Sequence, residues 1–248
     1  MSFPVIEGTR FEPFRLNELF DYQRHVVAKF FEDCRTAREV AEKVIRAIQY
    51  PLYMGRPDDQ HHWNHFHGKF DRTITEDYWQ TCSETALFLI GDCEDSSILT
   101  VGGARLKGVP PENVYVAFGV VKNATTDTIL GGHAYVFCRD ASFGTDKFVL
   151  VESTLDTPPP RYPEVGSTLE DLKRSFTWEG IVYVPEQLFN DVVYVEIRPL
   201  ITMRRRKERE RLEKYSAIER AWKIETKFTK ALRRSKLYRI KRALRLEG

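Results

Sequence analysis

The hydrophobic pattern of this chain changes period near residue 110, and that change limits the possible folds more than any other feature. Before it, apolar residues recur at three- and four-residue steps over residues 16–48 and 81–106, which predicts helices. Gly108 and Pro110 form a helix stop. After it, strand-like runs rich in Val, Tyr and Phe follow at residues 114–121, 133–138, 147–153, 181–184 and 192–197. Helices followed by strands predict an α+β fold.

Local signals refine this outline. Residues 16–48 divide into two predicted helices, and Thr36 with Glu39 resembles a capping box at the start of the second. The helical pattern of residues 81–106 is interrupted at Gly91. Residues 50–75 and 157–163 contain the prolines and polar clusters of loops, and residues 168–176 are a further candidate helix.

Charge divides the chain into two parts. The 248 residues carry a net charge of +2, yet residues 201–248 hold 18 Lys and Arg against 6 Asp and Glu. We therefore predict a domain at residues 1–200 and a basic amphipathic helical tail at residues 201–248. Such a tail can bind nucleic acid, an acidic membrane surface or an acidic protein. We favour a protein partner or an assembly, because the sequence contains no DNA-binding motif.

The sequence also bears on the compartment. No apolar run is long enough to span a bilayer, and no secretory signal is evident at the N-terminus. Four cysteines in a chain of this length do not make a disulfide framework, so reduced thiols are expected. These features predict a cytoplasmic protein, with a component of a virus particle as an alternative.

Three segments together predict thiol chemistry. Cys93 lies at a loop-to-helix junction, where the helix N-terminus favours a thiolate and lowers the thiol pKa. His133 follows two glycines at the start of one strand, and Glu152 lies at the end of the next. Two adjacent antiparallel strands could hold these two side chains together. The carboxylate would then orient the imidazole, whose other nitrogen would face Cys93.

The motif around the cysteine resembles that of the bacterial transglutaminase-like cysteine peptidases. The resemblance rests on the sequence DYWQT at residues 77–81, on Glu84 and on GDCEDSS at residues 91–97, and it spans roughly residues 37–156. It implies a papain-like or transglutaminase-like core with a cysteine helix packed on an antiparallel sheet. Carried over, Cys93 is the nucleophile, His133 the general base and acid, and Glu152 the orienting acid. The family usually has Asp at this last position, which leaves Asp156 as a substitute for Glu152.

Metal ligands form a second group of candidates. Some members of the family bind calcium through acids that flank the cysteine, and Asp92 and Glu94 match that pattern. Two carboxylates are fewer than the six or more oxygens that calcium takes, so no cofactor is required by the sequence and Ca²⁺ is an option. His61, His62, His65 and His67 could hold a transition metal, but we favour a polar loop near the cleft. Trp63 and Trp79 could line a substrate groove or shield the thiol.

The predicted function is a transglutaminase-like thiol enzyme that acts on protein amide bonds through an acyl-enzyme. The resemblance favours a cysteine peptidase, but the same residues serve hydrolysis and acyl transfer. The alternative is a structural or assembly protein on the same fold, in a virus particle for example, whose basic tail binds a partner.

Overall fold

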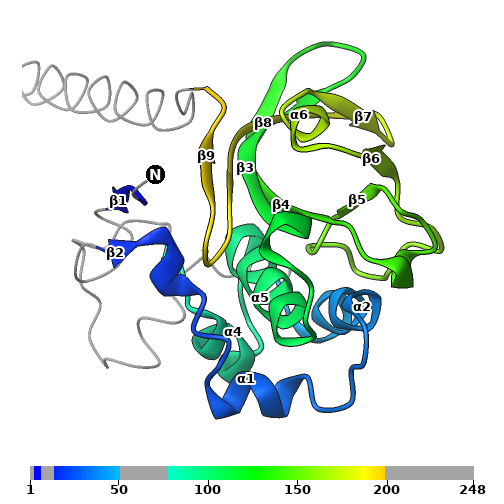
Figure 1. Ribbon diagram of the computed structural model, residues 1–248. Coiled ribbons are helices and arrows are strands. Elements are labelled where there is room, and N and C mark those ends of the chain that lie inside the picture. Colours follow the sequence, from blue (N-terminus) through cyan, green and yellow to red (C-terminus); the bar gives the residue numbers. More distant parts are fainter. Residues whose placement is uncertain (1–2, 7–13, 51–77, 199–248) are drawn as a thin grey trace, which may run out of the picture. The chain divides into compact units, whose positions relative to one another are not determined.

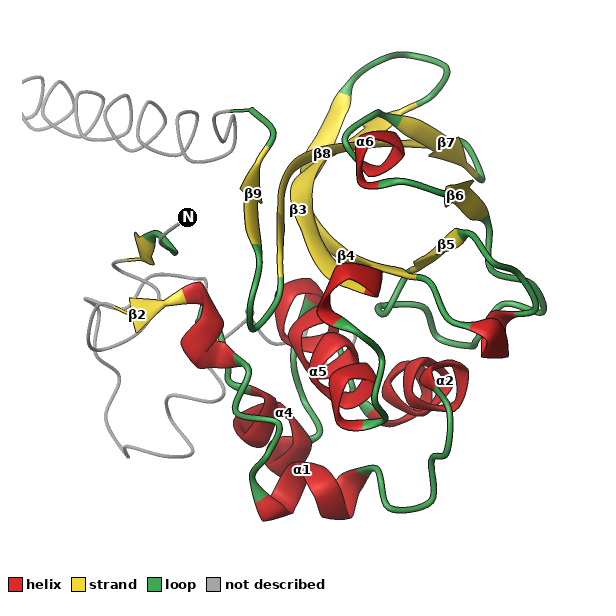
Figure 2. Cartoon of the chain, in the orientation of Figure 1, coloured by secondary structure: helices red, strands yellow, loops and turns green. Residues whose placement is uncertain are grey.

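The computed structural model describes residues 3–6, 14–50 and 78–198 (Figures 1 and 2). Its class is α+β, as the change of period predicts. The helical elements are a short 3-10 helix at Leu16–Leu19, α1 (His25–Phe30), α2 (Ala37–Ala47), α4 (Cys82–Phe88), α5 (Cys93–Leu106), two more 3-10 turns at Pro111–Asn113 and Ala141–Phe143, and α6 (Leu169–Leu172). The strands are β1 (Val5–Ile6), β2 (Phe14–Arg15), β3 (Val114–Asn123), β4 (Ile129–Cys138), β5 (Phe148–Val151), β6 (Glu164–Gly166), β7 (Phe176–Trp178), β8 (Ile181–Phe189) and β9 (Tyr194–Glu196).

The main sheet is antiparallel and has the strand order β6-β5-β4-β3-β8-β7, with β9 also paired to β8. Its centre is the long β3–β4 hairpin, in which Val114 pairs with Cys138 and Gly119 with His133. The pairing of β4 with β5 runs from Cys138 to Val136. Beyond that point β5 has ended, so the first half of β4 has β3 as its partner in the sheet.

The prediction of a helix at residues 168–176 is only partly correct. Thr168 caps a helix, but that helix ends at Leu172. The following residues form β7 because Phe176 and Trp178 pair with β8. The two strands are joined by Glu179 and Gly180, both with positive φ, which is typical of a tight hairpin turn. Long-range pairing therefore replaces the predicted helical turn.

Helix α5 lies between helices α1, α2 and α4 on one side and the sheet on the other (Figure 1). The residues of α5 from Cys93 to Ala104 are all buried. A Cβ at Gly103 would collide with Phe31 and Val40, so glycine allows the other helices to approach α5 closely. Gly108, with φ +87°, follows the helix at the predicted stop.

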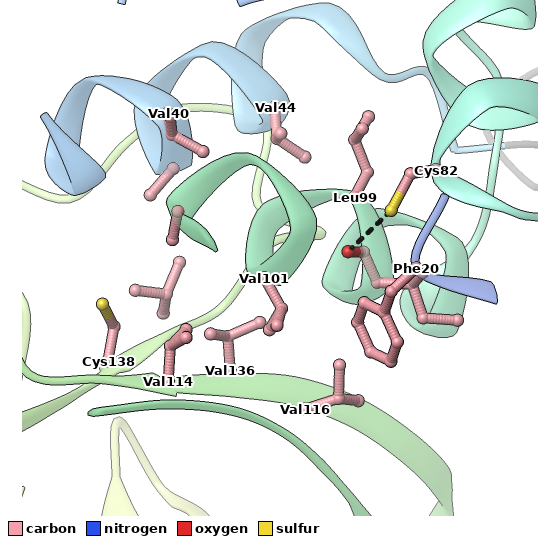
Figure 3. Close-up of a cluster of buried hydrophobic side chains, with 14 of the residues drawn as sticks. Phe20, Val40, Val44, Cys82, Leu99, Val101, Val114, Val116, Val136 and Cys138 are labelled. Atoms are coloured by element: carbon pink, nitrogen blue, oxygen red, sulfur yellow. Dashed lines mark hydrogen bonds between the residues drawn. The ribbon is translucent and has the colours of Figure 1, made fainter. Parts of the chain in front are cut away.

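A hydrophobic cluster joins this helical layer to the sheet (Figure 3). Val40 and Val44 of α2 point towards α5, where Leu99 lies beside Val44, whereas Val101 of α5 points towards the sheet and Val136 of β4. The predicted capping box that begins α2 is present: Thr36 Oγ1 accepts a hydrogen bond from the Glu39 backbone N–H at 3.2 Å. The core therefore fixes α5 against β4, with Cys93 near Ala134 in the middle of that strand.

The opposite face of the sheet carries a second, more aromatic cluster. On β4, Ala134, Val136 and Cys138 belong to the α5 side, whereas Tyr135 and Phe137 belong to the other. This alternation is that expected of a strand buried on both faces. The second cluster comprises Tyr115, Ala117, Tyr135, Phe137, Phe148, Leu150, Leu172, Tyr183 and Leu188.

Several predictions concern residues outside the described part. These are the loop at residues 51–75, the histidine cluster at residues 61–67 with Trp63, and the basic tail at residues 201–248. The domain boundary near residue 200 therefore stays a prediction. Within the described ranges, every helix is too short or too polar to cross a bilayer.

Candidate active site

Cys93 is the first residue of α5, as the sequence predicts. Asp92 is the N-cap, and Asp95 completes a capping box with it. The backbone N–H groups of the first turn have no partners within the helix, and the helix dipole is positive there. Glu94 and Asp95 place acidic groups in this turn.

Asp95 attaches the segment before α4 to the start of α5. Its Oδ1 accepts a hydrogen bond from the Gln80 backbone N–H at 2.7 Å, and its Oδ2 accepts from Gln80 Nε2 and, at 3.3 Å, from the Asp92 N–H. Gln80 Nε2 also donates to the Ile90 carbonyl at 3.1 Å. A Cβ at Gly91 would collide with the Asp95 side chain. These contacts hold the turn that contains Cys93 in place.

The Cys93 thiol is buried, with 8% of the residue exposed. It donates a hydrogen bond to Glu94 Oε2 at 3.2 Å. Burial and the nearby Asp92 carboxylate raise the pKa of Cys93 well above its usual value, although the Ala134 backbone N–H acts in the opposite direction. The prediction that the helix N-terminus lowers the pKa of this thiol is therefore wrong for this arrangement, because desolvation and acidic neighbours outweigh the dipole.

The structure brings His133 and Glu152 together. His133 Nε2 lies 2.7 Å from Glu152 Oε2. Because a carboxylate only accepts hydrogen bonds, Nε2 carries a hydrogen and donates a hydrogen bond to Oε2. The His133 side chain is 18% exposed and that of Glu152 is 7% exposed. The expected geometry of adjacent strands accounts for this contact, since β4 and β5 are antiparallel neighbours.

Glu152 receives hydrogen bonds on both carboxylate oxygens. Besides His133, Oε2 accepts from the Tyr183 hydroxyl at 3.2 Å, and Oε1 accepts from Thr154 Oγ1 at 2.7 Å and from the Thr154 N–H at 3.3 Å. Burial raises the pKa of Glu152, but the charge and hydrogen bond of His133 and the hydrogen bonds of Thr154 outweigh it. The pKa of Glu152 therefore lies below its usual value, and the buried group is a carboxylate at neutral pH.

The structure does not join the thiol to this pair by a hydrogen bond. Among the described residues, Cys93 is bonded to Glu94, and His133 Nδ1 makes no hydrogen bond. The thiol nevertheless lies near the middle of β4, because the N–H of Ala134, next to His133, affects its pKa. The catalytic roles of Cys93, His133 and Glu152 stay predictions.

Asp92, Cys93 and Glu94 form the group of possible metal ligands that the described residues contain. One ligand atom from each lies within 4.8 Å of the others, and all three residues are buried. The oxygens of Asp95 accept hydrogen bonds from Gln80 and Asp92, so Asp95 holds the local chain. The carboxylates named from the sequence, Asp92 and Glu94, are thus the oxygen donors of this group, and they suit a hard cation.

Two other candidates lie outside the hydrogen-bonded pair of His133 and Glu152. Trp79 is a buried core residue whose ring lies 5.4 Å from that of Phe118 and 6.4 Å from that of Phe189, so it does not line an open groove. Asp156, the substitute acid, lines a cavity of about 230 Å³, whereas Glu152 is the acid bonded to His133. The other described residues around this cavity are Ile45, Arg46, Ile48, Gln49, Tyr50, Gly91, Ser96, Ser153, Thr154 and Leu155.

Sequence reasoning missed three residues of this network. Gln80 belongs to the motif that was noticed, but nothing in the pattern indicates that it binds Asp95. Thr154 follows Glu152 by two residues, a spacing at which a hydroxyl can reach the carboxylate. Tyr183 lies 31 residues after Glu152, and no local signal connects the two.

No family model and no curated protein sequence matches this chain. Solved structures that this chain matches include LapG of Legionella pneumophila, at 15% identity over 73% of this chain and 84% of LapG, with a TM-score of 0.39. A calcium-bound form of LapG has 14% identity over 72% and 84% of the two chains and a TM-score of 0.34. A candidate cysteine protease from Cytophaga hutchinsonii has 10% identity over 70% and 49%, with a TM-score of 0.33. At these identities and TM-scores, function is inferred from the geometry of the site.

Proposed function

We propose that this protein is a thiol enzyme that acts on protein amide bonds, and specifically a cysteine peptidase of the transglutaminase-like type. The observation that supports the proposal best is the contact of 2.7 Å between His133 Nε2 and Glu152 Oε2, whose carboxylate also acts on the pKa of Cys93 at the N-terminus of α5. A buried carboxylate fixes the imidazole so that Nδ1 is the basic nitrogen. This is the arrangement that a neutral thiol needs to lose its proton during attack.

The reaction begins when the Cys93 side chain rotates from Glu94 towards His133. The sulfur attacks the carbonyl carbon of the substrate while His133 Nδ1 accepts the thiol proton, and a tetrahedral adduct forms. His133 then gives this proton to the leaving amine, the C–N bond breaks, and an acyl-enzyme remains. Water attacks the acyl-enzyme in hydrolysis, whereas a second amine attacks it in acyl transfer.

The oxyanion of the adduct is held by the backbone N–H of Cys93. This group is at the first position of α5 and makes no hydrogen bond within the described residues. A helix N-terminus offers such donors without reorganisation. The Gln80 amide is unsuited to this task, because Nε2 already donates to Asp95 and to the Ile90 carbonyl.

Calcium fits the donor set at Asp92 and Glu94, whose buried carboxylates lie together beside the thiol. A bound cation supplies positive charge that offsets these acids. The two side chains provide fewer oxygens than calcium takes, so backbone carbonyls, further residues or water complete the coordination. In the mechanism that we propose, Cys93, His133 and Glu152 carry out the chemical steps, and the cation is not required for them.

The test compares Cys93→Ala and Cys93→Ser with Cys138→Ala. Cys138 is a buried thiol on the α5 side of β4, and it lies within a strand and not at a helix N-terminus, so it is a matched control. We expect both Cys93 variants to lose hydrolysis of fluorescently labelled casein, and Cys138→Ala to keep it. Preferential alkylation of Cys93 by iodoacetamide, read by peptide mass spectrometry, should accompany activity. Hydrolysis that survives in Cys93→Ala refutes the proposal.

A structural or assembly protein on the same fold is the second candidate. The observation in its favour is that Cys93 is buried, with 8% of the residue exposed, and that its thiol donates a hydrogen bond to Glu94. In that case the basic tail binds a protein partner, deletion of residues 204–248 abolishes assembly, and iodoacetamide does not distinguish Cys93 from the other buried cysteines.

A further inference from the structure

We propose that Tyr183 is a positioning residue of the active site, which holds the Glu152 carboxylate in the orientation that His133 requires. The inference rests on the proposed function and adds to it a residue from a strand that is not adjacent to either β4 or β5. The direct observation is the hydrogen bond of 3.2 Å from the Tyr183 hydroxyl to Glu152 Oε2.

Tyr183 reaches Glu152 across the sheet. It lies on β8, and β3 separates β8 from β4. A Cβ at Gly119 of β3 would collide with the carbonyl oxygen of Val184, and the register of β3 and β8 shifts at this glycine. The glycine therefore permits an irregularity that brings the β8 backbone close to β3 beside Tyr183.

The ring of Tyr183 is held on two sides. It stacks on Phe176 of β7 at 4.9 Å with an interplanar angle of 6°, and it meets Tyr135 of β4 edge-on at 5.0 Å. The residue is 4% exposed. A buried hydroxyl on a ring fixed in this way loses little conformational freedom when it forms a hydrogen bond, so it suits the task of orienting a partner.

Both Tyr183 and His133 donate to the same oxygen of Glu152, and Thr154 donates to the other. Since a carboxylate only accepts, the Tyr183 hydroxyl must be the donor. Two further titratable groups from neighbouring elements interact with the charge of Glu152, namely the Cys93 thiol of α5 and the Tyr135 hydroxyl of β4. Tyr183 and Thr154 thus fix the plane of the carboxylate. The remaining hydrogen bond, from His133, is the one whose donor changes its protonation in the proposed reaction.

The experiment compares Tyr183→Phe with Tyr135→Phe. Tyr135 is a matched control: it is a fully buried tyrosine in contact with Tyr183, and its hydroxyl has no hydrogen-bond partner among the described residues. The measurement is the titration of the Glu152 carboxyl carbon by NMR in protein labelled with ¹³C-glutamate, with the resonance assigned through Glu152→Gln. We expect Tyr183→Phe to raise the midpoint by about one pH unit, since a donor to the charged form is lost, and Tyr135→Phe to leave it in place.

A midpoint that Tyr183→Phe does not change overturns the inference. If Tyr183→Phe fails to fold, 3-fluorotyrosine placed at position 183 strengthens the same donor and should lower the midpoint, and an unchanged midpoint again overturns it. The rate at which iodoacetamide alkylates Cys93 separates this inference from the proposed function. Suppose that Tyr183→Phe raises the midpoint of Glu152, but that neither Tyr183→Phe nor His133→Gln slows the alkylation of Cys93. This result supports the contact between Tyr183 and Glu152 and refutes the proposed enzyme.

Discussion

Asp95 and Glu152 are two buried carboxylates with different tasks. Asp95, at the N-terminus of α5, accepts hydrogen bonds from the amide groups of Gln80 and Asp92. Glu152, beyond the end of β5, accepts from hydroxyls and from an imidazole. Amide donors keep their protons, whereas an imidazole exchanges its proton near neutral pH. In the mechanism that we propose, the helix side of the site supplies rigidity and the sheet side carries the proton transfer.

The largest effect on stability is expected from Asp95→Ala. The substitution leaves the Gln80 and Asp92 donors buried without their acceptor, and we expect the free energy of unfolding to fall by about 3 kcal/mol. Urea denaturation measures it. Asp171→Ala is the control, because Asp171 has the same capping-box position in α6 but is only half-buried, with its hydrogen bonds near solvent. Equal losses in the two variants contradict a special role for the buried carboxylate.

Glu152→Gln should affect catalysis instead. The amide keeps the size of the side chain but lacks the charge that supports the protonated imidazole, so casein hydrolysis should fall by about 100-fold or more. Glu164→Gln is the control. Glu164 lies on β6, at the edge of the sheet, and forms an ion pair with Lys147. If Glu152→Gln hydrolyses casein at the wild-type rate, Glu152 is not the orienting acid.

The stability that Glu152 provides should depend on pH. Its pKa is lower in the folded protein than in the unfolded chain, so it contributes stability above the unfolded pKa. This contribution is lost as pH falls through the folded pKa. Urea denaturation of wild-type protein and Glu152→Gln should therefore show a difference in unfolding free energy at pH 7 that shrinks below about pH 4.5. A difference that stays constant down to pH 3 contradicts the assignment.

The smallest effect is expected just before α5. Leu89 ends α4 with φ 57°, a left-handed conformation that is unfavourable for leucine and tolerated by asparagine. Leu89→Asn should raise the free energy of unfolding by up to about 1 kcal/mol. Leu87→Asn, also at an exposed leucine but within the helix, should lower it. If both substitutions destabilise the protein, the left-handed residue is not a source of strain.

Local sequence signals predicted the elements that depend on local interactions. The capping box of Thr36 and Glu39, the interruption at Gly91 and the stop at Gly108 are all present. The contact between His133 and Glu152 was predictable because consecutive strands in an antiparallel sheet are usually neighbours.

Features that depend on distant segments were not predictable. Tyr183 reaches Glu152 across β3, and the β7–β8 pairing shortens the helix predicted at residues 168–176. The environment of Cys93 is a further case, since the helix N-terminus suggests a low pKa and burial beside Asp92 produces the reverse. In each case, tertiary packing decides the outcome.

The most direct test of the proposed site is the rate at which iodoacetamide alkylates Cys93 in wild-type protein and in His133→Gln at pH 7. If His133 accepts the thiol proton, the wild-type rate should exceed that of the variant by about tenfold or more. Equal rates in the two proteins contradict the proposal that the sulfur and the His133–Glu152 pair act together.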